Sequence, residues 1–274
     1  MKTKVRYFIA SLFIFSWTQT MGQLSGIATY QVQIERQLHM DDAKLSPEAR
    51  EQLQQQLKRQ LQKEFELKFD QANASWKEIP SLNEGPAGAT AGEMRVRIMT
   101  GGENALLYKN VQKGVMEENR ELMGKLFLIK DDLPHYEWQL TGETKQIGHY
   151  TCQRAVYLME TEEKIFSSES KSLETAKKTV EVEAWYTPEI PVSHGPERYW
   201  GLPGLIMELN ADNRRITCSK ILLDPQEKVA VDRPKKGKAV DVAKYNAIEG
   251  EKMQEMTNKY RGRSGGNIQI RTGG

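Results

Sequence analysis

The sequence has few of the side chains that usually carry catalysis or bind metal ions. Its four histidines lie far apart and form no His-x-His or His-Glu-x-x-His pattern, which argues against a histidine zinc site. It contains no Gly-x-Ser-x-Gly, no P-loop, no dinucleotide-binding fingerprint and no zinc ribbon. We therefore predict no catalytic residues, no metal and no cofactor, and we interpret the protein as a non-enzyme. The histidines are His39, His135, His149 and His194.

Three local groups resemble catalytic or metal-binding sites in composition alone. Ser193 and His194 are adjacent, and neighbours on an extended chain point apart, whereas a catalytic triad converges from separate segments. Cys152 and His149 are three residues apart in a strand-like run, so their side chains point to opposite faces. We interpret the group at 39–42 (His-Met-Asp-Asp) as a polar loop, and the eleven methionines as core packing rather than copper ligands.

Long apolar runs are also scarce. The run from Tyr7 to Trp17 is shorter than the ~20 residues that a membrane-spanning helix needs. It follows three cations and precedes Thr20-Met21-Gly22, an order typical of a secretory signal peptide. We predict that residues 1–22 are a signal peptide, that no transmembrane segment remains after its removal, and that the protein is exported to the periplasm or the cell surface. The alternative is a short membrane anchor. The three cations are Lys2, Lys4 and Arg6.

Neither sign of charge is in large excess. Removal of residues 1–22 takes away three cations and no acid, so the formal net charge of +2 becomes −1. A chain near neutrality has no overall field for a polyanion, and we expect no nucleic-acid partner. The basic run 233–238 is interpreted as a solvated linker, with binding of an anionic lipid or polysaccharide as the alternative.

The chain has only two cysteines, Cys152 and Cys218, both in strand-like runs. In an exported protein such a pair predicts a disulfide bond, which would stabilise the fold by roughly 4 kcal/mol. The alternative is two free, buried thiols.

Strand-like patterns dominate what is present. Ala28, Tyr30, Val32 and Ile34 alternate with polar residues, as in a half-buried strand. Short apolar runs then recur with turn residues between them, which predicts an antiparallel β domain over 23–224. The runs after residue 90 are 94–99, 105–111, 114–118, 125–129, 136–140, 149–159, 180–186, 204–209 and 214–223.

Two helices are predicted beside these strands. Ser46-Pro47-Glu48 is typical of a helix start, and Leu53, Leu57, Leu61 and Phe65 follow at four-residue spacing, so we expect an inserted helix at about 46–65. Residues 225–260 are predicted to form a polar linker and a C-terminal helix, and 261–274 a disordered tail. The expected class is α+β, mainly β, with a single curved antiparallel sheet or half-barrel.

The segment Trp185–Ile206 is the richest in aromatic, proline and glycine residues. Pro203 fixes its own φ near −65°, and Gly204 behind it suits the positive-φ position of a type II turn. The apolar side chains around this turn predict that it is buried. The candidate ligand-binding residues are Trp185, Tyr186, Tyr199, Trp200, Leu202 and Leu205, and the turn motif is Gly201, Leu202, Pro203, Gly204, Leu205 and Ile206.

This hexapeptide and the motifs around it resemble the GLPGLI family of secreted Bacteroidetes proteins. Similar motifs occur in order at 107–110, 125–134, 138–155 and 185–196. The resemblance implies a secreted protein on an antiparallel β scaffold whose function is poorly defined. The pattern also resembles the lipoprotein-carrier half-barrels of the bacterial envelope, which is an analogy of fold alone.

Three functional hypotheses follow. The first is a non-catalytic binding module that holds an apolar or peptide-like ligand on the concave face of the sheet. The second is a structural or interaction protein of the envelope that works through the 45–65 helix and the basic tail. The third is an unrecognised hydrolase. Ligand, partner and oligomeric state do not follow from the residues.

Overall fold

The computed structural model describes residues 24–34, 51, 62–80, 89–91, 94–96, 105–167, 172–227 and 229–261. Most of these residues form one open twelve-stranded sheet, with the strand order β14-β8-β7-β6-β3-β2-β1-β13-β12-β11-β10-β9. Neighbouring strands are antiparallel except β14, which runs parallel to β8. A separate hairpin pairs β4 (Ala89–Ala91) with β5 (Met94–Val96). The strands of the large sheet are β1 Gly26–Ile34, β2 Gln62–Phe69, β3 Asn73–Ile79, β6 Leu106–Asn110, β7 Val115–Leu122, β8 Lys125–Asp132, β9 Gln139–Ile147, β10 Tyr150–Ser167, β11 Ser172–Thr187, β12 Leu205–Ala211, β13 Arg214–Leu223 and β14 Lys238–Val240.

The expected α+β class is wrong, because the described chain is mainly β. Its long helix is α2 (Val242–Arg261), near the C-terminal end. The inserted helix expected at 46–65 is contradicted at its end, where Gln62 to Phe65 belong to strand β2. Of residues 46–61, the rest of that predicted helix, the structure describes residue 51 alone. Residues 1–22 and 262–274, the predicted signal peptide and most of the predicted tail, lie outside the described residues.

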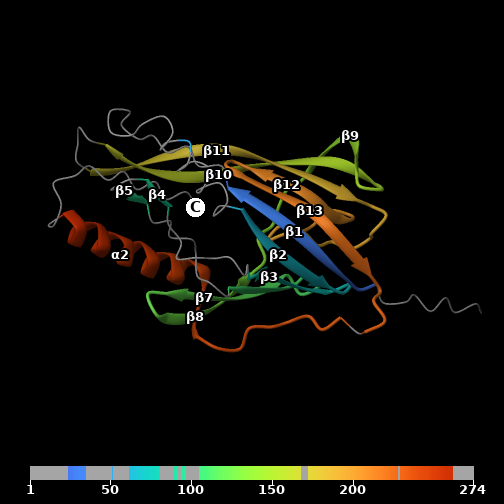
Figure 1. Ribbon diagram of the computed structural model, residues 1–274, viewed down its shortest axis with the longest axis horizontal. Coiled ribbons are helices and arrows are strands. Elements are labelled where there is room, and N and C mark those ends of the chain that lie inside the picture. Colours follow the sequence, from blue (N-terminus) through green and yellow to red (C-terminus); the bar gives the residue numbers. More distant parts are fainter. Residues whose placement is uncertain are drawn as a thin grey trace, which may run out of the picture.

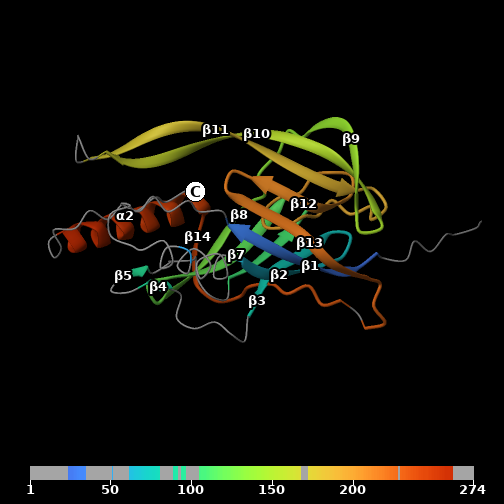
Figure 2. The same cartoon turned by 45° about the horizontal axis from the view of Figure 1, so that its top comes forward.

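The sheet is strongly bent. Figures 1 and 2 show β10 and β11 along one side of the molecule and β7 and β8 along the other, joined through β13, β1 and β2. Strand β1 shows why the bend encloses a core: its buried and half-buried residues alternate, so one face is apolar and turned inward. The inside of the bend is therefore where the two halves of the sheet meet.

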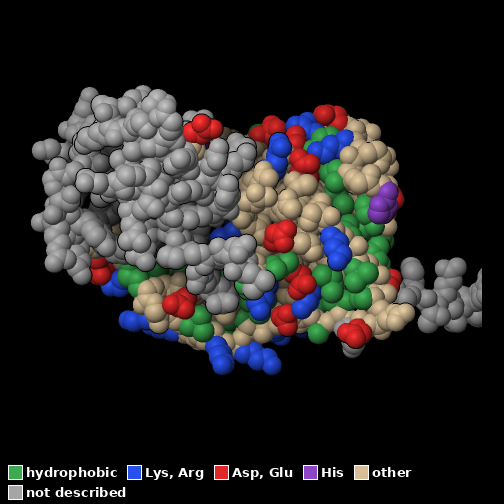
Figure 3. All heavy atoms as spheres, viewed as in Figure 1, with side chains coloured by type: hydrophobic (Ala, Val, Ile, Leu, Met, Phe, Trp, Pro, Cys, Tyr) green, Lys and Arg blue, Asp and Glu red, His purple; other side chains and the backbone are tan. Residues whose placement is uncertain are grey.

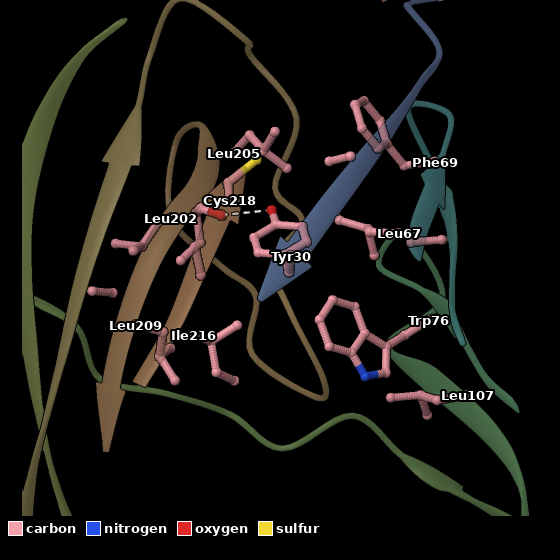
Figure 4. Packing of buried hydrophobic residues seen from close by; sticks show 14 of the residues in the cluster. Tyr30, Leu67, Phe69, Trp76, Leu107, Leu202, Leu205, Leu209, Ile216 and Cys218 are labelled. Carbon is pink, nitrogen blue, oxygen red and sulfur yellow. Dashed lines mark hydrogen bonds between the residues drawn. The ribbon is translucent and has the colours of Figure 1, made fainter. Parts of the chain in front are cut away.

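Tyr30 lies at the centre of this core. It is fully buried, and its ring packs edge-on against Trp76 with centroids 5.3 Å apart. Its hydroxyl donates a 2.7 Å hydrogen bond to the carbonyl oxygen of Ile206, so the buried polar atom is satisfied. Figure 4 shows Tyr30 between Leu67 and Trp76 on one side and Ile216 on the other.

Helix α2 is fixed to the sheet at its N-terminal end. The amide of Lys244 donates to Asp241 Oδ1 at 2.6 Å, and the amide of Val242 donates to Asp131 Oδ2 at 2.9 Å, so two free helix amides are capped. Tyr245 is 3% exposed and packs edge-on against Phe127 of β8, at 5.6 Å. Among the described helices, none is long and apolar enough to cross a membrane.

Candidate functional site

The segment between β11 and β12, residues 188–204, fills the inside of the bent sheet, and we refer to it as the 188–204 loop. Ile190, Val192 and Leu202 are at most 2% exposed and belong to the core. Two of its carbonyl groups accept hydrogen bonds from β12: Ile190 from the amide of Leu205 at 3.0 Å, and His194 from the amide of Ile206 at 3.0 Å. The loop is thus a packed part of the fold, and its backbone is paired as in a strand.

The turn at the end of this loop differs from the expected type II turn. Gly204 does not have a positive φ; the glycine in the left-handed region is Gly201, with φ +98°. Gly204 is required for a different reason, since a Cβ there would lie 2.2 Å from the carbonyl oxygen of Thr187. Lack of space, and not backbone conformation, therefore selects glycine at position 204.

Lys109 of β6 holds the loop from the opposite half of the sheet. Its side chain is fully buried, and its Nζ donates to the carbonyl oxygens of Gly195 at 2.7 Å and Tyr199 at 3.1 Å. Burial lowers the pKa of Lys109 to about 7, while the carboxylate of Glu197 acts in the opposite direction. A buried lysine with a lowered pKa is a common mark of a functional site. Here it has no accessible surface, so its evident role is to bind the loop.

His194 is equally buried and is not placed for catalysis. Its Nε2 lies 2.9 Å from the carbonyl oxygen of Asp70, and its Nδ1 has no partner within the described chain. Burial and the nearby charge of Lys109 lower the pKa of His194 to about 3, so the ring is neutral at pH 7. The hydroxyl of Ser193 accepts a hydrogen bond from the amide of Gly201 at 3.1 Å. Ser193 therefore serves the loop backbone, and His194 joins the loop to the chain between β2 and β3.

A chain of charged contacts ties the loop to helix α2. Arg198 donates to Glu118 of β7 at 2.7 Å, and the other oxygen of Glu118 accepts from Arg120 Nε at 2.5 Å. The guanidinium of Arg120 also lies 5.6 Å from the ring centroid of Tyr245, a cation–π distance. Glu118 is 6% exposed, so this pair of arginines compensates a buried carboxylate.

Five aromatic residues form a second feature beside the loop, which we call the aromatic cluster: Tyr136, Trp138, Tyr157, Tyr199 and Trp200. Tyr136 stacks on Tyr199 with centroids 5.2 Å apart and meets Tyr157 edge-on at 5.4 Å. The indole nitrogens are fixed to backbone carbonyls, Trp138 to Trp200 at 2.9 Å and Trp200 to Pro134 at 2.7 Å. All five side chains are partly exposed. The cluster is thus a rigid aromatic surface that solvent reaches.

Polar groups surround this surface. In the described part of the chain, the hydroxyls of Tyr136, Tyr157 and Tyr199 form no hydrogen bond. Burial raises the pKa of Tyr199 to about 12 and also raises that of Tyr136. Glu197 pairs with Arg214 beside Tyr199 and has φ +50°, a conformation that non-glycine residues seldom adopt.

The structure separates the ligand-binding residues that the sequence suggested. Tyr199 and Trp200 belong to the aromatic cluster, whereas Leu202 and Leu205 are 2% and 0% exposed in the core. Tyr186 is buried and donates from its hydroxyl to Gln153 at 2.7 Å. Trp185 lies beneath the ammonium group of Lys145, at 4.2 Å, and is 8% exposed. Sequence reasoning missed Tyr136 and Tyr157 as members of one site, and it also missed Lys109.

The predicted disulfide bond between Cys152 and Cys218 is absent, and both residues are buried free thiols. Cys152 lies on β10 and Cys218 on β13, and two strands separate them in the sheet. Burial raises the pKa of Cys152 to about 11 and that of Cys218 to about 12. Both are therefore protonated at pH 7 and are poor nucleophiles.

Within the part of the chain that the structure describes, no group of three or more His, Cys, Asp or Glu side chains is placed to hold a metal ion. Beside β10, the outer face carries charged contacts that compensate one another. Arg154, for example, meets Glu143 at 2.8 Å, Glu183 at 2.7 Å and Glu181 at 3.3 Å. The aromatic cluster and the adjoining loop are thus the best candidate for a functional surface.

Comparison with known proteins agrees in part with the resemblance seen in the sequence. Residues 138–208 match the model of a family described as "Protein of unknown function (Porph_ging)". The match covers β9, β10, β11, the 188–204 loop, the first part of β12 and every member of the aromatic cluster except Tyr136. The match supports similarity to this family of unknown function, and it does not show that the chain belongs to the GLPGLI family. No curated protein matches the chain.

Two solved structures of one protein are similar to this chain at low identity. "Structure of PNGF-II in C2 space group" is 14% identical with a TM-score of 0.48, over 83% of this chain and 33% of that one. "Structure of PNGF-II in P21 space group" is 13% identical with a TM-score of 0.49, over 84% of this chain and 34% of that one. The chain therefore spans about a third of the length of these structures.

Proposed function

We propose that this protein is an exported, GLPGLI-type envelope protein that acts as a non-catalytic binding module for an apolar or peptide-like ligand, held at the aromatic cluster. The observation that carries the proposal is a set of four partly exposed rings in mutual contact, with the fifth, Trp200, fixed beside them by hydrogen bonds to the backbone. Aromatic side chains supply large contact areas at little entropic cost, because they have few rotatable bonds.

The surroundings of the cluster favour a ligand with polar groups as well as apolar surface. Free tyrosine hydroxyls can donate to or accept from a peptide backbone, while the rings cover its side chains. Glu197 and Arg214 add a charged rim beside Tyr199. The strained backbone at Glu197 fits this role, since strain of this kind collects at binding sites.

The buried groups also support binding over catalysis. His194 is neutral and enclosed, with a pKa of about 3, and neither cysteine is a thiolate at pH 7. Lys109 has a pKa of about 7, but its two hydrogen bonds go to loop carbonyls and it has no contact with solvent. None of these groups is positioned to reach a substrate.

The proposal is tested by affinity capture from the native envelope with the chain that begins at Gln23, followed by mass spectrometry of bound peptides and lipids. The captured ligand is then titrated against Tyr136→Ala and Tyr199→Ala. Each variant is expected to bind at least about tenfold more weakly, as for a truncated aromatic anchor. Tyr150→Ala is the matched control, since Tyr150 is partly exposed on β10 outside the cluster.

Equal ligand binding by the wild type and the two cluster variants would rule out the aromatic cluster as the site. A screen for ester, peptide and glycoside turnover tests the non-catalytic part. Turnover by the wild type that is lost in a folded His194→Ala variant would show that the protein is a hydrolase.

A further inference from the structure

The segment before β14 is not the solvated linker that its composition suggests. Arg233 forms two hydrogen bonds with the carboxylate of Glu117, both at 2.7 Å, and its guanidinium lies 4.9 Å from the ring centroid of Tyr108. Gly237, with φ +127°, approaches β8 so closely that a Cβ would lie 2.5 Å from the carbonyl carbon of Phe127. Residues 233–238, which we call the basic strap, are therefore held firmly on the sheet.

The lysine side chains of the strap are exposed to solvent. Pro234 is buried, whereas Lys235, Lys236 and Lys238 are exposed. Strand β14 pairs Lys238 with Phe127, so this lysine lies beside the start of β8, which Lys125 and Leu126 begin. Figure 3 shows basic side chains projecting along the lower edge of the molecule, where Figure 1 draws β8 and the chain that leads to β14.

These lysines are free of compensating contacts. Lys125 is exposed like the three strap lysines, and none of the four side chains forms an ion pair or hydrogen bond in the described part of the chain. Glu121 lies opposite Leu126 on β7, and this exposed acid offsets one of the four charges. The patch therefore keeps a net positive charge on a rigid support.

The tip of the β7–β8 hairpin adds exposed apolar side chains to the same patch. Met123 is 49% exposed and Leu126 is 37% exposed. Met123 also has φ +49°, a left-handed conformation that asparagine and glycine adopt readily and a bulky apolar residue does not. An apolar residue that is both strained and exposed at a turn indicates a role outside the fold.

We infer that the β7–β8 hairpin tip and the basic strap form a docking surface for an anionic lipid bilayer. The lysines would lie among acidic headgroups, and Met123 and Leu126 would enter the interface between them. A soluble acidic polysaccharide would gain the charge contacts but would not cover the two apolar side chains. This combination selects the membrane surface as the occupant, and it is independent of the ligand proposed for the aromatic cluster.

The test is co-sedimentation of the chain that begins at Gln23 with lipid vesicles. This chain lacks the apolar run Tyr7–Trp17, which would bind lipid by itself, and retains every described residue. We expect binding to vesicles of phosphatidylcholine mixed with phosphatidylglycerol, little binding to phosphatidylcholine alone, and weaker binding as salt is raised. The triple variant Lys125→Gln, Lys236→Gln, Lys238→Gln is expected to bind about a hundredfold more weakly, at about fivefold per lysine.

Two further variants separate docking from folding. Met123→Asn suits the left-handed turn better, so it is expected to keep or raise the melting temperature while vesicle binding falls about tenfold. Lys220→Gln removes an exposed lysine of β13, outside the patch, and is expected to bind like the wild type. Absence of wild-type binding, equal binding to both vesicle types, or a triple variant no weaker than Lys220→Gln would overturn the inference. Binding to soluble alginate without binding to vesicles would show that the surface binds an acidic polysaccharide and not a membrane.

Discussion

Lys109 Nζ lies 2.7 Å from the carbonyl oxygen of Gly195 and so joins strand β6 to the 188–204 loop across the inside of the sheet. The two residues are 86 positions apart in the sequence. Because Lys109 is the group that ties the loop to this half of the sheet through two carbonyls, it should affect stability more than any exposed lysine.

Replacing Lys109 with methionine is expected to lower the free energy of unfolding by about 3 kcal/mol, because two buried carbonyls lose their donor. Urea unfolding of Lys109→Met measures this. Lys220→Gln, at an exposed position of β13, should change the value by less than about 0.5 kcal/mol. A Lys109→Met variant as stable as the wild type would mean that the loop does not need this anchor.

Lys109 also predicts how stability changes in mild alkali. Its pKa is about 7 in the folded state and near 10.5 when unfolded, so the unfolded chain binds more protons between these values. Stability should therefore rise from pH 7 to about pH 9, beyond which the raised pKa values of the cysteines act in the opposite direction. The free energy of unfolding is measured for the wild type and Lys109→Met and plotted against pH. The two plots should have the same slope at pH 6 and different slopes between pH 7 and 9.

His194 predicts a loss of stability in acid. Its pKa is about 3 in the folded state and near 6.5 when unfolded, so protonation of the unfolded chain competes with folding below pH 6.5. The loss can reach ~4 kcal/mol as the pH falls to about 3. His194→Gln removes the titrating group, and its stability should fall less over the same range. Parallel pH profiles for the two proteins would contradict this assignment.

Gly204→Ala is expected to destabilise the protein by more than about 3 kcal/mol or to prevent folding, because the added Cβ would meet the Thr187 carbonyl oxygen at 2.2 Å. Gly250→Ala is the matched control. Position 250 lies within α2 with open space around it, so alanine there should stabilise by about 0.5–1 kcal/mol. Thermal unfolding of both variants checks the pair, and normal melting of Gly204→Ala would refute the close contact.

Because Cys152 and Cys218 are free thiols, we expect reductant to have no effect on the stability of the protein. The melting temperature should be the same with and without reductant, and a thiol reagent should titrate two thiols after unfolding but react slowly with the native protein. If no free thiol is detected in the unfolded, unreduced protein, the two cysteines form a disulfide bond after all.

Strand positions were predictable because apolar runs and turn residues are local signals. The run 214–223 coincides with β13, and 125–129 begins where β8 begins. The helix expected at 46–65 failed at its end because a spacing of four residues is ambiguous. Residues four apart share one face of a helix and also one face of a strand, so Leu61 and Phe65 fit both. For Phe65, which the structure describes, pairing with β1 and β3 decides in favour of the strand.

The candidate site was predictable only where its residues adjoin in the sequence. Tyr199 and Trp200 belong to one motif, but Tyr136, Trp138 and Tyr157 come from other parts of the sequence and meet them only in the fold. Lys109 gave no signal because a lysine in a strand usually faces water. Strand β6 is instead covered on both faces, by the 188–204 loop and by Arg233 of the basic strap, so four consecutive residues are buried.

The pairing of β1 with β13 has a consequence for the order of events during synthesis. Gly26 is registered with Leu223, so β1, the first of the described strands to leave the ribosome, has a free edge until the distant strand β13 has been made. Such an edge invites association with other chains. A nascent molecule of this protein must therefore be kept apart from its neighbours, or moved to another compartment, before it can complete its own sheet.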